Sequence, residues 1–176
     1  FAPTSSPAQL AALGEMGLHQ AIGVFGPKRA EQHEEITWVA ELFPEAQDYT
    51  DVYDRFGLLR DGALMGHAIH LSPRERDRLK EAGASLIHCP TSNTFIGSGL
   101  FDMAGLMAGG QRIGLATDTG GGSSFSMLRT MAAAYEIAQL RGTALHPSQL
   151  LWLATVGSAR ALRLGDRIGN LAPGLE

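Results

Sequence analysis

The sequence predicts an α/β fold in which short parallel strands alternate with helices. Apolar runs rich in β-branched or small residues recur along the chain, and a longer segment with helical periodicity follows each run. At 176 residues the chain is long enough to bury a core as one domain. We expect the strands at Ala21–Phe25, Ala63–Ile69, Ala84–Cys89 and Arg112–Thr117.

Four strand–helix units are half of a (β/α)8 barrel, and a complete barrel typically needs about 250 residues. Four strands cannot close on themselves. The sequence therefore predicts either a small open doubly wound sheet or the second half of a barrel. In both folds, chemistry takes place at the carboxyl ends of the strands.

The helix after the second strand has the clearest start. Ser72 is a suitable N-cap, Pro73 suits the first helical position, and Glu75 stands where a capping box needs a glutamate. Gly83 would end this helix. The other helices are expected at Pro7–Leu13, Glu31–Leu42, Asp48–Phe56, Leu100–Ala108, Ser124–Leu140 and Ser148–Leu162.

The composition excludes several classes of protein. A net charge of −4 with 18% charged residues offers no basic surface for nucleic acid, and no apolar run is long enough to span a membrane. One cysteine cannot form an internal disulfide, so we expect a cytoplasmic protein. Because the chain opens with Phe1 and stops just after a turn, we also expect it to be a fragment.

Three of the predicted strands end in reactive groups. His67 follows Leu64–Gly66 near the end of the second strand, His88 and Cys89 close the third, and Asp118 follows the fourth. A histidine or aspartate at one such position is commonly a loop residue or a helix cap. Three together favour a shared site, where imidazole and carboxylate groups could bind a divalent metal that acidifies a water molecule.

Other candidate residues have simpler interpretations. The glycine-rich segment Thr119–Ser124 matches no phosphate-binding motif and is better read as a tight turn. Cys89 and His88 are adjacent in a strand and face opposite sides, so they cannot form a catalytic pair, and we interpret Cys89 as structural. His70 lies in a loop. Three further histidines have no supporting context, namely His19, His33 and His146. The methionines, including Met127 and Met131 at helical spacing, are predicted to lie in the core rather than to bind a ligand.

Several longer strings resemble the guanine deaminases, members of the amidohydrolase superfamily. The resemblance covers the whole chain except about Gly17–Arg29. The strings are Phe1–Ser5, Gly66–Leu71, His88–Asn93, Gly97–Asp102, Thr117–Gly122 and Ser126–Met131.

This resemblance implies the C-terminal half of a (β/α)8 TIM-type metal-dependent hydrolase barrel, about strands 5 to 8, as one partial domain over residues 1–176. It implies one Zn²⁺, with Fe²⁺ as the other possibility, that activates water to attack the ring carbon carrying the exocyclic amine of guanine. The products would be xanthine and ammonia. The full-length protein would be a homodimer, and its substrate would be a small purine.

The resemblance also implies roles for individual residues. Asp118 would be a metal ligand and would take a proton from the bound water. His67 would hydrogen-bond that water rather than bind the metal. Glu31 would carry protons to a ring nitrogen and the leaving amine, and Phe1 would contact the purine face, so Phe1, Glu31 and Asp118 would all touch the substrate. His88 and Asn93 would order the surrounding loop.

The sequence departs from the family at one metal ligand. The family places a histidine where this chain has Lys28, and an ammonium has no lone pair to offer a metal. One hypothesis is a local frameshift, since Val24–Arg29 can be encoded by DNA whose neighbouring frame restores a glutamine–threonine–histidine string. The alternative is a natural, catalytically dead relative.

The metal-binding histidine pair on the first strand of the family barrel has no counterpart in this chain, so we expect the chain by itself to be inactive. Two alternatives to a guanine deaminase stay open. One is another amidohydrolase that acts on an aminopurine, a pterin or a triazine. The other is a metal-free binding or subunit module. Half a barrel would also expose two strand edges, which predicts poor solubility.

Overall fold

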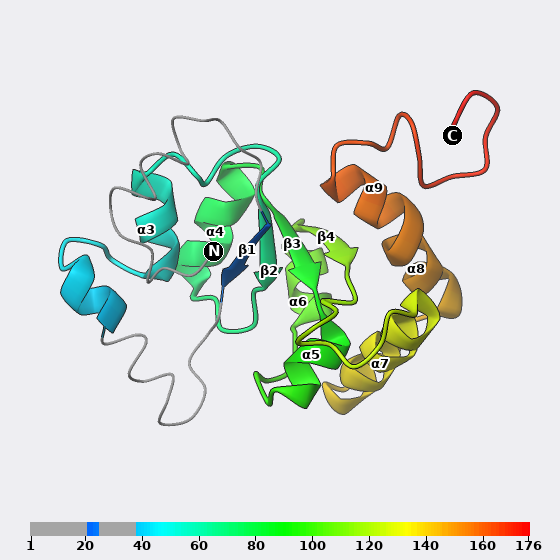
Figure 1. Cartoon of the computed structure of the whole chain (residues 1–176), viewed down its shortest axis with the longest axis horizontal. Helices are drawn as coiled ribbons and strands as arrows, with labels where there is room; N and C mark the ends of the chain where they lie inside the picture. The colour runs from blue at the N-terminus through cyan, green and yellow to red at the C-terminus, as the bar shows by residue number, and fades with distance from the viewer. Residues whose placement is uncertain (1–20, 25–37) are drawn as a thin grey trace.

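The computed structural model describes residues 21–24 and 38–176, and in it four short strands form one parallel sheet. The strands lie side by side in chain order, from β1 to β4 (Figure 1). Gly66 pairs with Ile87, and Ile87 pairs with Gly114, so the carboxyl ends of neighbouring strands meet at one edge. The predicted parallel sheet is confirmed. The strands are β1 (Ala21–Val24), β2 (Leu64–His67), β3 (Ser85–His88) and β4 (Arg112–Leu115).

Helices follow the strands as expected, although several begin later than the sequence suggested. Residues 38–42 are also helical, whereas the segment predicted at Pro7–Leu13 lies outside the described residues. The helices are α3 (Tyr49–Arg55), α4 (Pro73–Glu81), α5 (Pro90–Phe95), α6 (Met103–Ala108), α7 (Met127–Leu140), α8 (Pro147–Trp152), the π-helical turn η1 (Leu153–Gly157) and α9 (Ser158–Ala161).

The predicted cap of α4 is present in full. The Ser72 hydroxyl accepts a hydrogen bond from the Glu75 backbone N–H at 3.2 Å, and the Glu75 carboxylate accepts one from the Ser72 N–H at 2.9 Å. The buried Glu75 carboxylate also accepts a bond from the Thr50 hydroxyl at 2.9 Å. One capping residue therefore starts α4 and ties it to α3.

Two features of the helical layer were not predicted. Helix α5 begins at Pro90 directly after β3, where the threonine, serine and asparagine side chains are weak helix formers. The final helix is interrupted by η1, which lets the Ser158 hydroxyl bond both the Leu153 carbonyl at 2.8 Å and the Leu115 N–H at 3.1 Å. The π-helical turn thus places Ser158, the first residue of α9, against β4.

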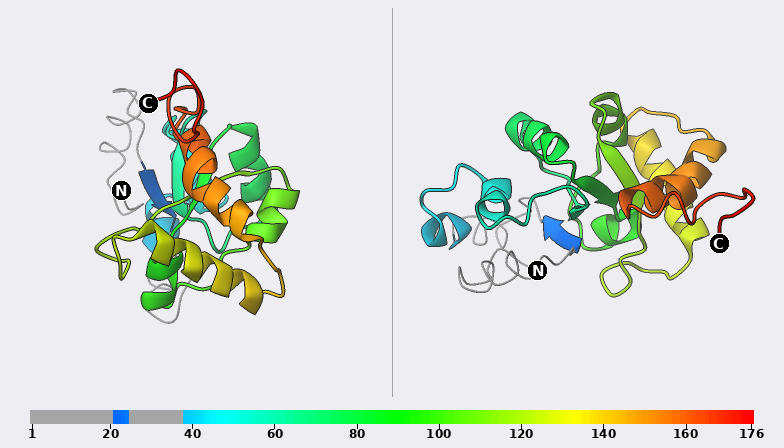
Figure 2. Two further views of the ribbon diagram at one scale, coloured as in Figure 1. Left: turned by 90° about the vertical axis from the view of Figure 1, so that its right-hand side faces the viewer. Right: turned by 90° about the horizontal axis from the view of Figure 1, so that it is seen from above.

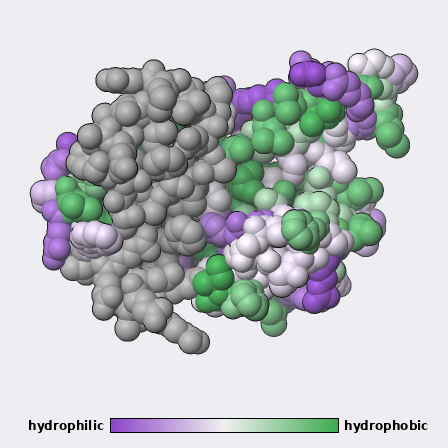
Figure 3. Space-filling model, in the orientation of Figure 1, coloured by the Kyte–Doolittle hydropathy of each residue, from purple (hydrophilic) through white to green (hydrophobic). Residues whose placement is uncertain are grey.

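The core lies between the sheet and the surrounding helices. Met65, Leu86 and Ile113 occupy equivalent positions on three neighbouring strands and are buried. Helix α3 lies beyond the β1 side of the sheet, and α8 and α9 lie beyond the β4 side (Figures 1 and 2). Figure 3 shows hydrophobic residues gathered over α8 and α9 on one face. Exposed large apolar side chains there include Leu151, Trp152 and Leu162.

The amino ends of the strands carry an ionic cluster. Asp61, which precedes β2, accepts a hydrogen bond at 3.2 Å from Arg112, the first residue of β4. Arg163, after α9, pairs with the same carboxylate. These contacts join the β2, β4 and α9 segments at the edge of the sheet opposite to the carboxyl ends.

Candidate functional site

His67 and Asp118 meet at the carboxyl edge of the sheet. His67 is the last residue of β2, and Asp118 lies three residues after the end of β4. The distance from His67 Nε2 to Asp118 Oδ2 is 3.6 Å. The His67 side chain is 9% exposed and the Asp118 side chain 37%, so the pair opens toward solvent on the carboxylate side. The predicted convergence of these two residues is confirmed.

Both residues adopt the left-handed backbone conformation, with positive φ, that residues other than glycine rarely adopt. The φ angles are 67° at His67, 46° at Ala68 and 48° at Asp118. At His67 the chain makes a three-residue turn, with the Ala68 N–H bonded to the Gly66 carbonyl at 2.8 Å. Strained backbone of this kind costs about 1–3 kcal/mol per residue and gathers at functional sites. Here it turns two polar side chains toward one another.

Asn93 on α5 orients the His67 ring. The distance from its side-chain Oδ1 to His67 Nδ1 is 2.7 Å, and Asn93 is fully buried. Because an amide oxygen only accepts hydrogen bonds, Nδ1 carries the hydrogen, and in the neutral ring Nε2 keeps its lone pair on the side facing Asp118. The expectation that Asn93 orders the site therefore agrees with the geometry.

Cys89, which the sequence predicted to be structural, is the third member of the cluster. One potential ligand atom each from His67, Cys89 and Asp118 lies within 4.8 Å of the other two. Burial, followed by the negative charge of Asp118, raises the pKa of the Cys89 thiol to about 12. The protonated thiol lies 3.6 Å from the Ile87 carbonyl, to which it donates. A signal was present, because Cys89 directly follows a strand that ends level with His67.

His88 does not join this cluster. Its ring is fully buried and stacks on the Phe101 ring, with centroids 4.4 Å apart and planes inclined by 12°. Burial, with a smaller contribution from His67, lowers the His88 pKa to about 3. The expected opposite orientation of His88 and Cys89 is correct. The suggestion that His88 shares the site with His67 and Asp118 is wrong, because its side chain enters the core.

The glycine-rich turn after Asp118 is shaped by close packing. A Cβ atom at Gly122 would lie 2.0 Å from the Thr117 carbonyl oxygen, and one at Gly121 would lie 2.8 Å from the buried Ser92 hydroxyl and 3.2 Å from Asp118 Oδ2. Side chains therefore cannot be accommodated where this loop folds back against α5. The interpretation as a tight turn fits this geometry.

Several other predicted residues have roles outside the cluster or lie outside the described residues. His70 is exposed, and its Nε2 lies 2.8 Å from the Ser98 carbonyl. His146 caps α8. Met127 and Met131 pack against the core as expected. The proposed catalytic Glu31, the proposed substrate contact Phe1 and the departure at Lys28 lie outside the described residues, as do His19 and His33.

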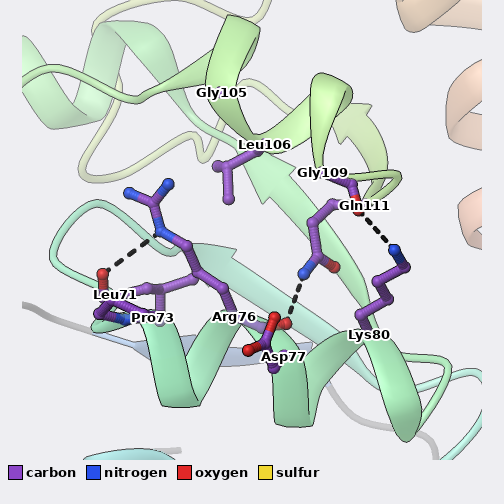
Figure 4. A pocket seen from close by; sticks show the side chains of 9 residues that line it. All are labelled: Leu71, Pro73, Arg76, Asp77, Lys80, Gly105, Leu106, Gly109 and Gln111. Atoms are coloured by element: carbon purple, nitrogen blue, oxygen red, sulfur yellow. Dashed lines mark hydrogen bonds between the residues drawn. The ribbon is translucent and has the colours of Figure 1, made fainter.

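Two hollows lined by described residues lie away from His67 and Asp118. One, of about 480 Å³, lies between α4 and α6 (Figure 4). Its polar groups are engaged locally: Lys80 donates to the Gly109 carbonyl at 2.7 Å, and Gln111 donates to the Arg76 carbonyl. The other, of about 630 Å³, lies between α8, η1 and the C-terminal segment. Neither hollow includes a member of the candidate site.

Comparisons with known proteins cover the whole chain. The model of the amidohydrolase family matches residues 1–176. The guanine deaminase of Escherichia coli is 40% identical over 176 residues, which are 100% of this chain and 40% of that protein. This chain therefore spans about two fifths of the length of that curated relative.

Solved structures agree on the fold. The E. coli guanine deaminase structure has a TM-score of 0.90 at 39% identity, covering 100% of this chain and 41% of that one. A guanine deaminase from C. acetobutylicum with bound guanine has a TM-score of 0.86 at 26% identity, covering 97% and 42%. An adenosine deaminase from Xanthomonas campestris with bound zinc has a TM-score of 0.83 at 25% identity, covering 99% and 40%. These matches confirm the barrel-type interpretation over the open doubly wound sheet.

Proposed function

The chain belongs to the amidohydrolase family, and from this we propose that it forms part of a guanine deaminase that hydrolyses guanine to xanthine and ammonia. The observation that carries the proposal is the contact between His67 and Asp118, at 3.6 Å, on two left-handed backbone positions at the carboxyl edge of the sheet. The E. coli relative supports guanine as the substrate. The C. acetobutylicum structure, which holds guanine, supports it too.

The described residues fit a divalent metal. Their carboxylate, imidazole and thiol donors lie close together, and the amidohydrolases are metal-dependent enzymes. Zinc is the ion we propose, as in the X. campestris neighbour, with Fe²⁺ as the other possibility. Asp118 would hold the ion, which when bound lowers the pKa of a water molecule toward neutrality.

The proposed protein groups then position and move protons. Asp118 would accept the proton of the attacking water on a carboxylate oxygen. His67, with its tautomer set by Asn93, would accept a hydrogen bond from the attacking water on Nε2. Once Nε2 has taken up a proton, it would donate to the oxygen that develops negative charge. Glu31 would deliver protons to the ring nitrogen and the leaving amine, and Phe1 would contact the purine face. These two assignments follow from the family resemblance.

The activity is proposed for the whole protein, of which this chain would supply only part of the ligand set. Within this chain, Asp118 is the one metal ligand that the resemblance supplies, because Lys28 stands at a histidine position. We expect the isolated chain not to turn over guanine. Reading the coding DNA through Glu31 tests whether a glutamine–threonine–histidine string is encoded in another frame.

We also propose that the complete deaminase is a cytoplasmic homodimer. Separately, no helix among the described residues is long and apolar enough to cross a membrane.

The test is xanthine formation by the full-length protein encoded by the gene, loaded with zinc. Asp118→Asn and His67→Gln should each lower kcat/KM for guanine by at least about 100-fold, because each removes a group that acts on the reacting water. The exposed Asp166→Asn change is the control and should leave the rate unchanged. Faster turnover of adenine or a chlorinated triazine than of guanine would instead favour another amidohydrolase activity. Guanine binding without metal and without turnover would favour a binding module.

A further inference from the structure

We propose that Ser92 is a positioning residue for Asp118, whose carboxylate it holds by a hydrogen bond in the metal-bound enzyme. Ser92 lies on α5 and is fully buried, and its hydroxyl has no hydrogen-bond partner among the described residues. A buried hydroxyl without a partner costs free energy of folding, so its presence needs a physical reason. The inference rests on the proposed role of Asp118 in the deaminase.

Ser92 and Asp118 face the same point of the glycine-rich turn. Ser92 Oγ lies 2.8 Å, and Asp118 Oδ2 lies 3.2 Å, from the position that a Cβ atom on Gly121 would occupy. Because glycine has no side chain, that position is left open beside the two oxygens. The Asp118 side chain is 37% exposed, which gives it room to rotate. Rotation of the two side chains therefore brings these oxygens to the distance of about 2.5–3.0 Å at which an O–H donates to an oxygen.

The usual partner of a helical serine already has a donor here. Serine and threonine hydroxyls in a helix commonly bond the carbonyl four residues earlier, as Thr94 does with the Pro90 carbonyl at 3.0 Å. For Ser92 that carbonyl belongs to His88, and it accepts the Ala116 N–H at 3.0 Å. The pairing of β3 with the chain beyond β4 thus leaves the Ser92 hydroxyl to the Asp118 side.

The residues on either side of Ser92 support the same site. Asn93 Oδ1 lies 2.7 Å from Nδ1 of His67, and the Thr91 hydroxyl donates at 3.4 Å to the carbonyl of the residue that precedes Asp118. All three side chains of this helical turn are buried. One turn of α5 therefore contacts the segments of both reactive residues, and Ser92 is its member nearest to the Asp118 carboxylate.

A serine suits the task proposed for Asp118, which is to hold a metal and to accept a proton. The hydroxyl donates to a carboxylate oxygen and so limits the rotation of the whole group. Because the hydroxyl is neutral, it adds no positive charge that would repel the metal ion. Metal-binding carboxylates are commonly held by such outer hydrogen bonds, and loss of one typically weakens metal binding or activity by about 10–100-fold.

The test compares two buried serines of the same chain. Ser85, at the amino end of β3, is also fully buried, and among the described residues its hydroxyl has no partner either. In the metal-free full-length protein, Ser92→Ala and Ser85→Ala should each leave the urea midpoint unchanged or raise it, because each removes an unpartnered buried hydroxyl. Only Ser92→Ala should weaken zinc binding, by about 10-fold in competition with a chelator.

Guanine kinetics give a second readout. At saturating zinc, Ser92→Ala should lower kcat by about 10-fold and leave KM unchanged, because Ser92 acts through Asp118 and does not contact the substrate. Ser85→Ala should leave both constants unchanged. The same two variants thus separate a hydroxyl that positions Asp118 from one that is merely buried.

Three results would overturn the proposal. One is a zinc affinity in Ser92→Ala equal to that in Ser85→Ala. Another is a urea midpoint lower in Ser92→Ala than in the unmodified protein, which would give the hydroxyl a structural role. The third is a full-length protein that binds no zinc. If the protein binds zinc but does not turn over guanine, the deaminase function fails, and the zinc affinities of the two variants still decide the role of Ser92.

Discussion

His67 shows how a single residue acquires its chemistry from its neighbours. The three-residue turn aims its ring across the strand ends, and Asn93 decides which nitrogen faces Asp118. The pattern of reactive residues at strand ends was sufficient to predict the meeting of His67 and Asp118. It could not reveal Asn93 as the group that sets the tautomer, because that contact depends on a helix whose sequence gives little helical signal.

His88 makes a residue-scale prediction about pH. Its folded pKa, lowered to about 3 by burial, lies below the unfolded value of about 6.5. The unfolded state therefore binds more protons between these values, so stability is full above about pH 6.5 and falls as pH decreases, by up to about 1.4 kcal/mol per pH unit. Urea unfolding at a series of pH values measures this slope.

The control for that prediction is His88→Leu, which keeps an apolar surface against Phe101. Its stability should depend less steeply on pH between about 6.5 and 4.5, because the titrating ring is gone. Equal slopes in the two proteins would mean that the His88 ring becomes protonated without unfolding. Such a result would place solvent or a hydrogen-bond acceptor next to the ring.

Among the elements, α4 and α5 mark what sequence can and cannot specify. The capping box at Ser72 is a local signal, and both of its hydrogen bonds, between Ser72 and Glu75, are formed in the structure. Helix α5 has no such signal: its N-cap Cys89 makes no side-chain hydrogen bond. Contacts with α7 hold it, and these join segments far apart in the chain. The π-helical interruption at η1 also depends on a contact between segments far apart in the chain, because the Leu115 N–H donates to the Ser158 hydroxyl. Local helix propensity does not predict it.

The glycine-rich turn gives a prediction at the scale of elements. Gly122→Ala should destabilise the protein by about 1–3 kcal/mol, because the new methyl group would collide with the Thr117 carbonyl. The displaced turn should also weaken zinc binding at Asp118. Chemical denaturation and metal titration of the same variant measure both effects.

Gly109→Ala provides the comparison. Gly109 ends α6 with φ at −69°, and the nearest atom to its added Cβ would be 3.3 Å away. We expect a change within about 1 kcal/mol. If Gly122→Ala were equally mild, the close packing of the turn against Thr117 would be incorrect.

At the scale of the whole molecule, the sheet has two outer strands. Among the described residues, no strand pairs with the outer edge of β1, and apolar side chains such as Leu151 and Leu162 are exposed. Unpaired edges and apolar surface favour association with another copy. Sedimentation velocity at increasing protein concentration should therefore show reversible or irreversible oligomers. A monomer at all concentrations that unfolds sharply and reversibly would contradict this expectation.

The two ends of the sheet differ in how well they should tolerate amino-acid substitutions. The salt bridges of Asp61 with Arg112 and Arg163 hold strand and helix segments together at the amino ends, far along the strands from the reactive side chains. Substitutions around Asp118 would leave these salt bridges in place. A protein engineer could therefore diversify the carboxyl-end loops of this chain while keeping its scaffold, so that a library of new specificities inherits one common foundation.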